Sequence, residues 1–270
     1  MNDLGDGGVD LAMDRPHSAR MYDYYLGGIT NFPADRETAV KTLNAFPAAP
    51  VAARINRRFM HRATRYAAER GVHQFLDIGT GIPTSPNLHE IAQGVVPRAR
   101  VVYTDNDPIV LAHARALLRS HPDGVTAYLQ ADARDPHQIL THHILTTTLD
   151  FTRPIALSLV ALLHFLTDDE AHALVDRLKA ALPVGSTLAI SHGTPDFDPE
   201  GLARVARIYA EAGSPIRLRT HGEIAAFFAG WDLVEPGVVA TRAWRPDPDD
   251  PAHTVTDAEA STYAALARKP

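Results

Sequence analysis

Three aspartates stand at the ends of three short apolar segments of the chain. Asp77 comes just before a glycine pair in Gly79-Thr80-Gly81, while Asp105 and Asp132 end two later apolar runs. Carboxylates in such positions can bind an ammonium group, ribose hydroxyls and the exocyclic amine of adenine. The glycines permit positive φ and leave room for a ligand against the main chain. The pattern predicts a site for a ligand that contains a nucleoside.

The spacing of the glycines argues against a phosphate on that ligand. A dinucleotide fingerprint has a third glycine where this chain has Thr84, and that glycine lets pyrophosphate reach a helix N-terminus. The carboxylate of Asp77 would also repel pyrophosphate, whereas it would attract the ammonium of an amino acid. S-adenosylmethionine (SAM) has the ammonium, the ribose and the adenine without a phosphate. The alternative is a tight turn that binds nothing.

The two later aspartates are assigned separate roles in this interpretation. Asp105, which is followed by Asn106, is the predicted partner of the ribose hydroxyls. Asp107 competes for that role, but the proline after it is typical of a helix N-cap. We expect the Asp132 carboxylate to accept from the adenine amine and the Ala133 N–H to reach a ring nitrogen. The alternative for either carboxylate is a solvated acid at a strand end.

A cluster of tyrosines near the amino terminus has two interpretations. Tyr22, Tyr24 and Tyr25 precede the pair Gly27-Gly28, so this segment could form a hinged lid with the Tyr22 ring near the sulfonium. A cation over an aromatic face gains roughly 0.5 to 2 kcal/mol, depending on its desolvation. The alternative is that these rings pack a helix onto the edge of the sheet.

Two of the 14 histidines follow predicted strands at the end where an acceptor would approach. His164 and His192 are therefore the candidate general bases, although a hydrogen-bonded wall residue is the plainer interpretation of each. No histidine pair has helical metal-ligand spacing with an acidic partner, so no metal site is predicted.

The elements that would position these residues alternate between strands and helices. Short apolar strands are expected at residues 74–78, 100–104, 125–130, 154–160, 186–191, 231–239 and 263–268. Amphipathic helices between them predict βαβ units, and therefore a three-layer, Rossmann-like α/β fold with a mostly parallel sheet of seven strands. A helix at residues 51–70 brings Arg54, Asn56 and Arg57 either to the border of the site or to a solvated face.

The chain is expected to have three parts. Residues 1–14 are rich in glycine and aspartate and are predicted to be a disordered lead-in, with no features of a signal peptide. Residues 15–71 are predicted to form a helical cap or lid. Residues 72–270 are predicted to be the SAM-binding domain.

Composition limits the partners and the compartment. The 26 Lys and Arg against 32 Asp and Glu give a net charge of −6, so no basic surplus favours nucleic acid or an anionic membrane. No apolar run approaches the roughly 20 residues of a membrane span. With no cysteine, thiolate chemistry is excluded and a cytoplasmic location is expected. The sequence does not indicate an oligomeric state.

Several motifs resemble those of class I SAM-dependent methyltransferases. The segments that carry the resemblance are Asp77-Ile78-Gly79-Thr80-Gly81, residues 103–108 and residues 130–133. Tyr22-Asp23-Tyr24-Tyr25-Leu26-Gly27-Gly28, with Asn31-Phe32 and Ala34-Asp35-Arg36, resembles the signature of one largely actinobacterial methyltransferase family. The resemblance implies the class I fold, SAM as cofactor, and methyl transfer to an acceptor that is expected to be a small molecule. The alternatives are a non-catalytic SAM-binding protein and, less in keeping with Thr84, an NAD(P)-dependent oxidoreductase.

Overall fold

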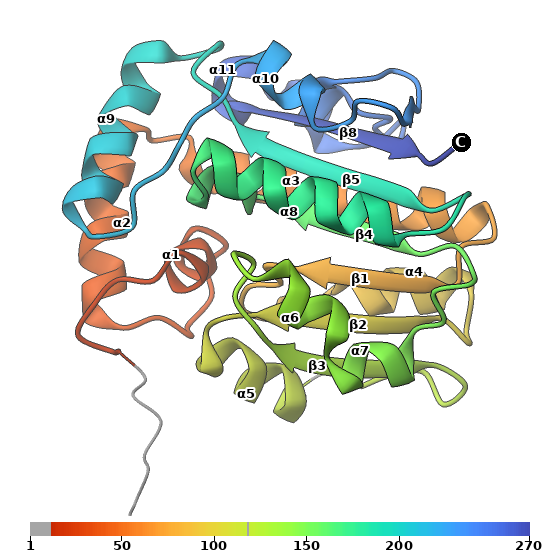
Figure 1. The fold of residues 1–270 in the computed structure, drawn as a ribbon. Helices are drawn as coiled ribbons and strands as arrows, with labels where there is room; N and C mark the ends of the chain where they lie inside the picture. Colours follow the sequence, from red (N-terminus) through yellow and green to blue (C-terminus); the bar gives the residue numbers. More distant parts are fainter. Residues whose placement is uncertain (1–11, 118) are drawn as a thin grey trace, which may run out of the picture.

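The computed structural model describes residues 12–117 and 119–270, which form an eight-stranded sheet with helices on both faces (Figure 1). The strands are β1 (Gln74–Ile78), β2 (Arg100–Asp105), β3 (Val125–Gln130), β4 (Ala156–Val160), β5 (Thr187–Gly193), β6 (Asp232–Leu233), β7 (Val239–Ala240) and β8 (Thr262–Arg268). Their order is β3-β2-β1-β4-β5-β8-β6, and β7 also pairs with β8. Strands β1 to β5 are parallel, whereas β8 is antiparallel to its neighbours. The three-layer, mostly parallel architecture expected from the sequence is confirmed.

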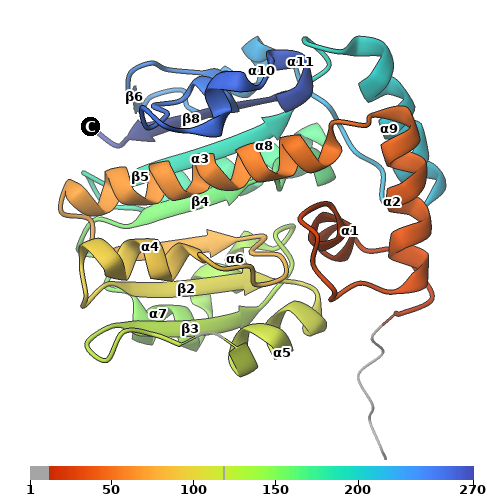
Figure 2. The same ribbon diagram turned by 180° about the vertical axis from the view of Figure 1, so that it is seen from behind.

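Two layers of helices cover the sheet, and Figures 1 and 2 show one layer each. One layer contains α6 (Pro136–Thr141), α7 (His143–Thr148), α8 (Asp168–Ala181) and α10 (His221–Ala226). The other contains α3 (Ala49–Glu69), α4 (Leu88–Val95) and α5 (Pro108–Leu117). The carboxyl-terminal part adds α11 (Asp257–Ala260) and the short 3-10 helices η2 (Thr241–Ala243) and η3 (Pro251–Thr254), and η1 (Leu163–Phe165) follows β4.

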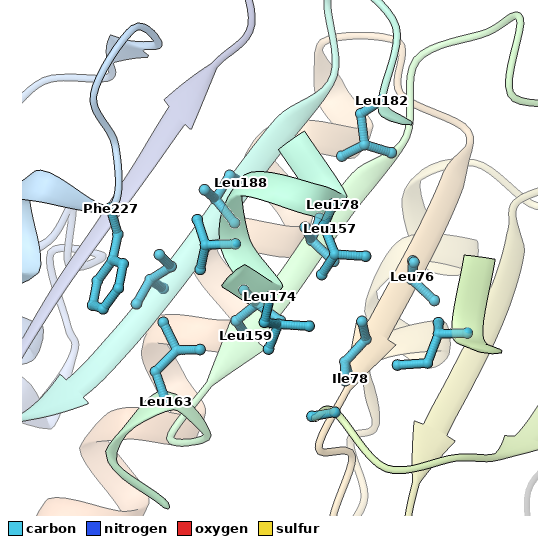
Figure 3. Packing of buried hydrophobic residues seen from close by; sticks show 14 of the residues in the cluster. Leu76, Ile78, Leu157, Leu159, Leu163, Leu174, Leu178, Leu182, Leu188 and Phe227 are labelled. Atoms are coloured by element: carbon cyan, nitrogen blue, oxygen red, sulfur yellow. The ribbon is translucent and has the colours of Figure 1, made fainter. Parts of the chain in front are cut away.

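Alternation along β1 fills both faces of the sheet. Leu76 and Ile78 belong to the cluster that includes Leu178 of α8 (Figure 3), whereas Phe75 packs with Leu88 of α4 on the opposite face. All five side chains are essentially excluded from solvent. Burying each contributes roughly 1.5 to 3 kcal/mol, which makes β1 a rigid base for the loop that follows it.

Three helices lie beyond the carboxyl ends of the parallel strands. Helices α1 (Ser18–Tyr25), α2 (Pro33–Ala45) and α9 (Pro199–Glu211) stand together at this end in both ribbon views (Figures 1 and 2). Apolar residues of all three helices share one buried cluster, which includes Met21, Leu202 and Val205. Helix α3 differs from them because it runs along a face of the sheet, in contact with β4, β5 and β8.

One predicted strand is wrong. Residues 231–239 were expected to form a single strand, but they form β6 and β7 with a turn between them. Pro236 has no N–H for a sheet, and Gly237 adopts a φ of +84° while its N–H donates to the Val234 carbonyl at 2.9 Å. The turn ends the pairing of β6 after Leu233 and restarts it at Val239. In the described residues this stretch therefore contributes two short strands to the sheet instead of one.

The amino-terminal lead-in falls mostly outside the described residues, because the first eleven positions are not described. Within the described part of the chain, no helix has the length and apolar character needed to cross a membrane.

Helix α3 is fastened to the carboxyl-terminal segment by a buried guanidinium. Arg62 donates to the Trp244 carbonyl, the Thr241 carbonyl and the Asp250 carboxylate, each at 2.8 Å. Beside it, the Trp244 ring meets Phe59 edge to face, with ring centroids 5.3 Å apart. These contacts fix α3, whose amino-terminal end reaches the carboxyl edge of the sheet.

We expect Arg62→Met to lower the free energy of unfolding by about 3 kcal/mol, because two buried carbonyls lose their donor and Asp250 keeps only the longer 3.4 Å contact with Arg58 as its cationic partner. Arg65→Met is the matched control, since Arg65 pairs with Asp247 at the surface and its loss should cost under about 1 kcal/mol. Urea unfolding of both variants gives the comparison. Equal losses would contradict the role of Arg62.

Candidate functional site

A cavity of about 470 Å³ lies at the edge of the sheet where the parallel strands end. Its walls come from the loops after β1, β2, β3 and β4 and from α1, α2, α3 and α9. Every residue predicted to bind the cofactor is part of the lining: Tyr22, Asp77, Gly79, Thr80, Gly81, Asp105, Asn106, Asp132 and Ala133. Residues far apart in the sequence are thus brought to one site by the parallel sheet.

The glycine loop requires glycine at its first position for two reasons. Gly79 has a φ of +76°, and a Cβ there would lie 2.8 Å from the Leu162 Cδ1 atom. The Gly79 N–H donates to the Thr104 carbonyl at 2.8 Å, which continues the pairing of β1 with β2. Gly81 also has positive φ, at +69°. The loop therefore turns sharply and presents backbone to the cavity.

Asp105 connects the glycine loop to the end of β2. One carboxylate oxygen accepts from the Gly81 N–H and the other from the Asp107 N–H, both at 2.9 Å. Burial raises the pKa of Asp105, and these two backbone donors oppose the increase. Each oxygen keeps a lone pair for a further donor, as the two hydroxyls of a ribose require. Asp107 caps α5 by accepting from the Ile109 N–H at 2.8 Å.

Asp77 is a buried carboxylate without a cationic partner. Burial raises its pKa to about 6, against the opposing effects of the Ser158 and Thr80 hydroxyls and of Arg57. No ion pair to Asp77 is present among the described residues, and Arg57 donates to the carbonyls of Thr84 and Pro86. An unpaired, desolvated carboxylate of this kind fits the ammonium group of a ligand.

The loop after β3 is more exposed. The side chain of Asp132 is 44% exposed and accepts from the backbone N–H of Arg134 at 2.9 Å and from its guanidinium at 3.3 Å. Ala133 is buried, and both residues line the cavity. This end of the cavity can hold a flat base, with donors and acceptors at its rim.

Helix α1 covers the cavity and is tied down on two sides. The Tyr22 hydroxyl donates to the Ala53 carbonyl at 2.9 Å and accepts from the Asn56 amide at 3.0 Å. Arg20 is buried, with its Nε atom 3.7 Å from Asp35 and 3.5 Å from Asp107. Because its hydroxyl is bound to Ala53 and Asn56, the Tyr22 ring lies between α1 and α3.

Two residues that the sequence left between a border position and a solvated face prove to line the cavity. Asn56 and Arg57 both contribute to the wall, whereas Arg54 is exposed and does not.

The loop after β4 carries one of the two predicted histidines into the wall. Ala161 has a φ of +54°, and its N–H donates to the Ser191 carbonyl at 3.1 Å. His164 follows in η1 and lines the cavity, and neither ring nitrogen has a hydrogen-bond partner among the described residues. Burial, with a smaller effect of Arg219, lowers the pKa of His164 to about 4, so the imidazole is neutral at pH 7.

The structure does not bring His192 to the cavity. Its ring is fully buried, where Arg219 Nη1 lies 2.8 Å from Nε2 and the Gly193 carbonyl lies 2.7 Å from Nδ1. Burial lowers the pKa of His192 well below its usual value. The sequence located this histidine at the correct strand end but not on the side of the strand that faces the cavity.

Half of the cavity was not predicted at all. Beyond His164 its walls are aromatic and aliphatic side chains, which we call the apolar half: Tyr25, Phe46, Phe165, Leu202, Val205 and Tyr209. The spacing of the last three on α9 indicates a buried face, but it does not show what that face covers. Among the described residues, no group of three or more potential metal ligands is present.

Comparisons with known proteins agree with this geometry. A family model described as S-adenosyl methyltransferase matches residues 7–270. The chain is 51% identical to a DUF574 family protein from Streptomyces avermitilis MA-4680, covering 96% of this chain and 100% of that one with a TM-score of 0.93. A protein from Thermobifida fusca YX is 41% identical over 96% of this chain and 97% of its own, with a TM-score of 0.88.

More distant structures share the fold. Human N-acetylserotonin methyltransferase, crystallised with SAM, is 16% identical over 87% of this chain and 55% of its own, with a TM-score of 0.51. A search of curated proteins finds no match. A match over nearly the whole length of the chain establishes the family. The chain belongs to the S-adenosyl methyltransferase family and is a SAM-dependent methyltransferase.

Proposed function

We propose that the protein transfers a methyl group from SAM to a small-molecule acceptor held inside the cavity. The observation that carries this proposal is the cover formed by α1, α2 and α9 over the carboxyl edge of the sheet. A cavity of about 470 Å³ under this cover is in the range of small-molecule sites, which supports a small acceptor.

The three carboxylates are assigned to the cofactor. Asp77 and the backbone of Gly79–Gly81 hold the methionine part, Asp105 with Asn106 holds the ribose, and Asp132 with Ala133 holds the adenine. Support comes from the unpaired, buried state of Asp77 and from the spare lone pairs of Asp105. Tyr22 would border the sulfonium side from α1.

The sulfonium of bound SAM supplies an already activated methyl group, so the protein's contribution is to position the acceptor and exclude water. His164 is proposed as the proton acceptor when the nucleophile carries a proton. Its imidazole is neutral at pH 7 and has no partner among the described residues. A neutral imidazole can accept a proton, but a pKa of about 4 makes this one a weak base, because a general base works best with a pKa near the operating pH.

We expect Asp105→Ala to weaken SAM binding at least about tenfold, because a charge-assisted pair of hydrogen bonds is lost. Isothermal titration calorimetry with SAM and with NAD(P) measures the effect, and Asp123→Ala in an exposed turn is the control. Circular dichroism confirms folding, since the change also removes the acceptor of two backbone N–H groups. An unchanged dissociation constant in a folded variant contradicts the ribose assignment, and binding of NAD(P) with no binding of SAM contradicts the cofactor site.

Asp77→Asn is expected to stabilise the ligand-free protein while weakening SAM binding at least about tenfold. Because the pKa of Asp77 is raised from 3.8 to about 6, the native state binds more protons than the unfolded chain between these values. Stability present at low pH is therefore lost as the pH rises through 6. The variant should gain up to about 3 kcal/mol at pH 7 and little at pH 4.

Urea unfolding at the two pH values, beside an Asp123→Asn control, measures this gain. A stability difference that is the same at pH 4 and pH 7 would show that the Asp77 charge is not its cause.

The acceptor class is tested by supplying radiolabelled SAM to the protein together with size-separated cell extract. We expect the label to appear in products below about 1 kDa, because a cavity of about 470 Å³ is in the range of small-molecule sites. Extract incubated with radiolabelled SAM but without the protein is the control. Label in protein or nucleic acid would refute a small-molecule acceptor.

A further inference from the structure

The cavity is divided by charge along the order of the strands. The carboxyl ends of β1 and β2 and the loop after β3 each place an aspartate in the wall. The lining at the carboxyl ends of β4 and β5, which includes Leu162, Phe165 and Gly193, has no carboxylate. The cationic side chains in the described lining, Arg57 and Arg134, bind to the loops after β1 and β3. The apolar half therefore has no charged side chain, and His164 at its border is neutral at pH 7.

Aromatic rings form a continuous wall through the apolar half. The His164 and Phe165 rings have centroids 4.4 Å apart, and the Phe165 and Tyr209 rings have centroids 6.2 Å apart at an angle of 38°. Leu202 and Val205 of α9 belong to the same cluster. Such walls bind an apolar body well, but they offer nothing to replace the hydration of a charge.

Two tyrosine hydroxyls are the polar feature of this half. The hydroxyl oxygens of Tyr25 and Tyr209 lie 3.3 Å apart, so one hydroxyl donates to the other. Burial raises the pKa of Tyr25 and raises that of Tyr209 well above its usual value, so both phenols stay protonated. Two protons with one mutual hydrogen bond leave a second O–H in the pair.

The second O–H has one possible acceptor outside the pair, the hydroxyl oxygen of Thr42. Thr42 lies beside Tyr25 and donates its own hydroxyl proton to the Thr38 carbonyl at 3.1 Å, so its oxygen can accept from Tyr25. In that arrangement Tyr209 donates to Tyr25, and the tyrosine oxygens keep unused lone pairs. In the reverse arrangement Tyr25 donates to Tyr209, and the Tyr209 O–H has no partner among the described residues. Both tyrosines line the cavity. Either way the pair can bind a ligand's hydroxyl or carbonyl.

We propose that the methyl acceptor is an uncharged molecule with an apolar, ring-sized body and a polar group bound by the Tyr25–Tyr209 hydroxyl pair. This proposal rests on the proposed function, because it assigns the apolar half to the acceptor. Tyr25 and Tyr209 are specificity-determining residues in this assignment. The cofactor half supplies charge, and the apolar half selects against it.

The test uses three matched probes that imitate a methylated product: 4-methoxybenzyl alcohol, 4-ethylanisole and 4-methoxybenzoate. Their binding to the full-length protein saturated with S-adenosylhomocysteine is measured by ligand-observed NMR titration. We expect the neutral alcohol to bind at least about tenfold more tightly than the carboxylate, because the walls cannot solvate an anion. The ethyl compound, which lacks the hydroxyl, should bind more weakly than the alcohol.

Tyr209→Phe separates the hydroxyl pair from the rest of the wall. The variant should weaken binding of the alcohol about three- to tenfold and change binding of 4-ethylanisole less than about twofold, as expected for one lost hydrogen bond. Tyr66→Phe, on the outer side of α3 beside Trp244, is the matched control and should change neither.

Two results would overturn the proposal: carboxylate binding as tight as that of the alcohol, or no binding of any probe. Failure of the wild-type protein to bind S-adenosylhomocysteine is a separate result. It would refute the cofactor site first and the acceptor class with it.

Discussion

One short loop, residues 105–107, holds together the parts of the molecule that meet at the cavity. The Asp105 carboxylate accepts from the Gly81 N–H and so fixes the glycine loop. The Asp107 carboxylate caps α5 and faces Arg20 and His17 of the amino-terminal segment. Interactions among charged groups are strong here because the atoms are shielded from water. The glycine loop and the amino-terminal segment that covers the cavity are therefore both held by residues 105–107.

The sequence predicted which residues gather at the carboxyl edge of the sheet, and the reason is geometric. Parallel strands end at one edge, so an aspartate that closes a buried apolar run must lie near the others, as Asp77, Asp105 and Asp132 do. The predicted strand boundaries at β1 to β5 agree with the structure within two residues. The residue at the carboxyl end of each of these strands could therefore be predicted from the sequence.

The apolar half of the cavity could not be predicted in this way because it depends on contacts between distant segments. The spacing on α9 indicates that Tyr209 is buried, but only the fold places it against Tyr25 from the other end of the chain. His192 does not line the cavity for a related reason: a position at the end of a strand does not determine which side of the sheet a residue faces. The single strand expected at residues 231–239 does not form, because Pro236 and Gly237 introduce a turn despite the apolar pattern around them.

The left-handed backbone of Ala161 has a consequence for the neighbouring histidine. A non-glycine residue in this conformation costs roughly 1 to 3 kcal/mol, and here it is held by the Ser191 carbonyl and by the contact of Leu162 with Gly79. Glycine would relieve that strain, but it would also give the unfolded chain more conformations to lose on folding. Alanine lowers that entropy cost, so folding itself, rather than an arriving molecule, supplies the free energy that orders His164.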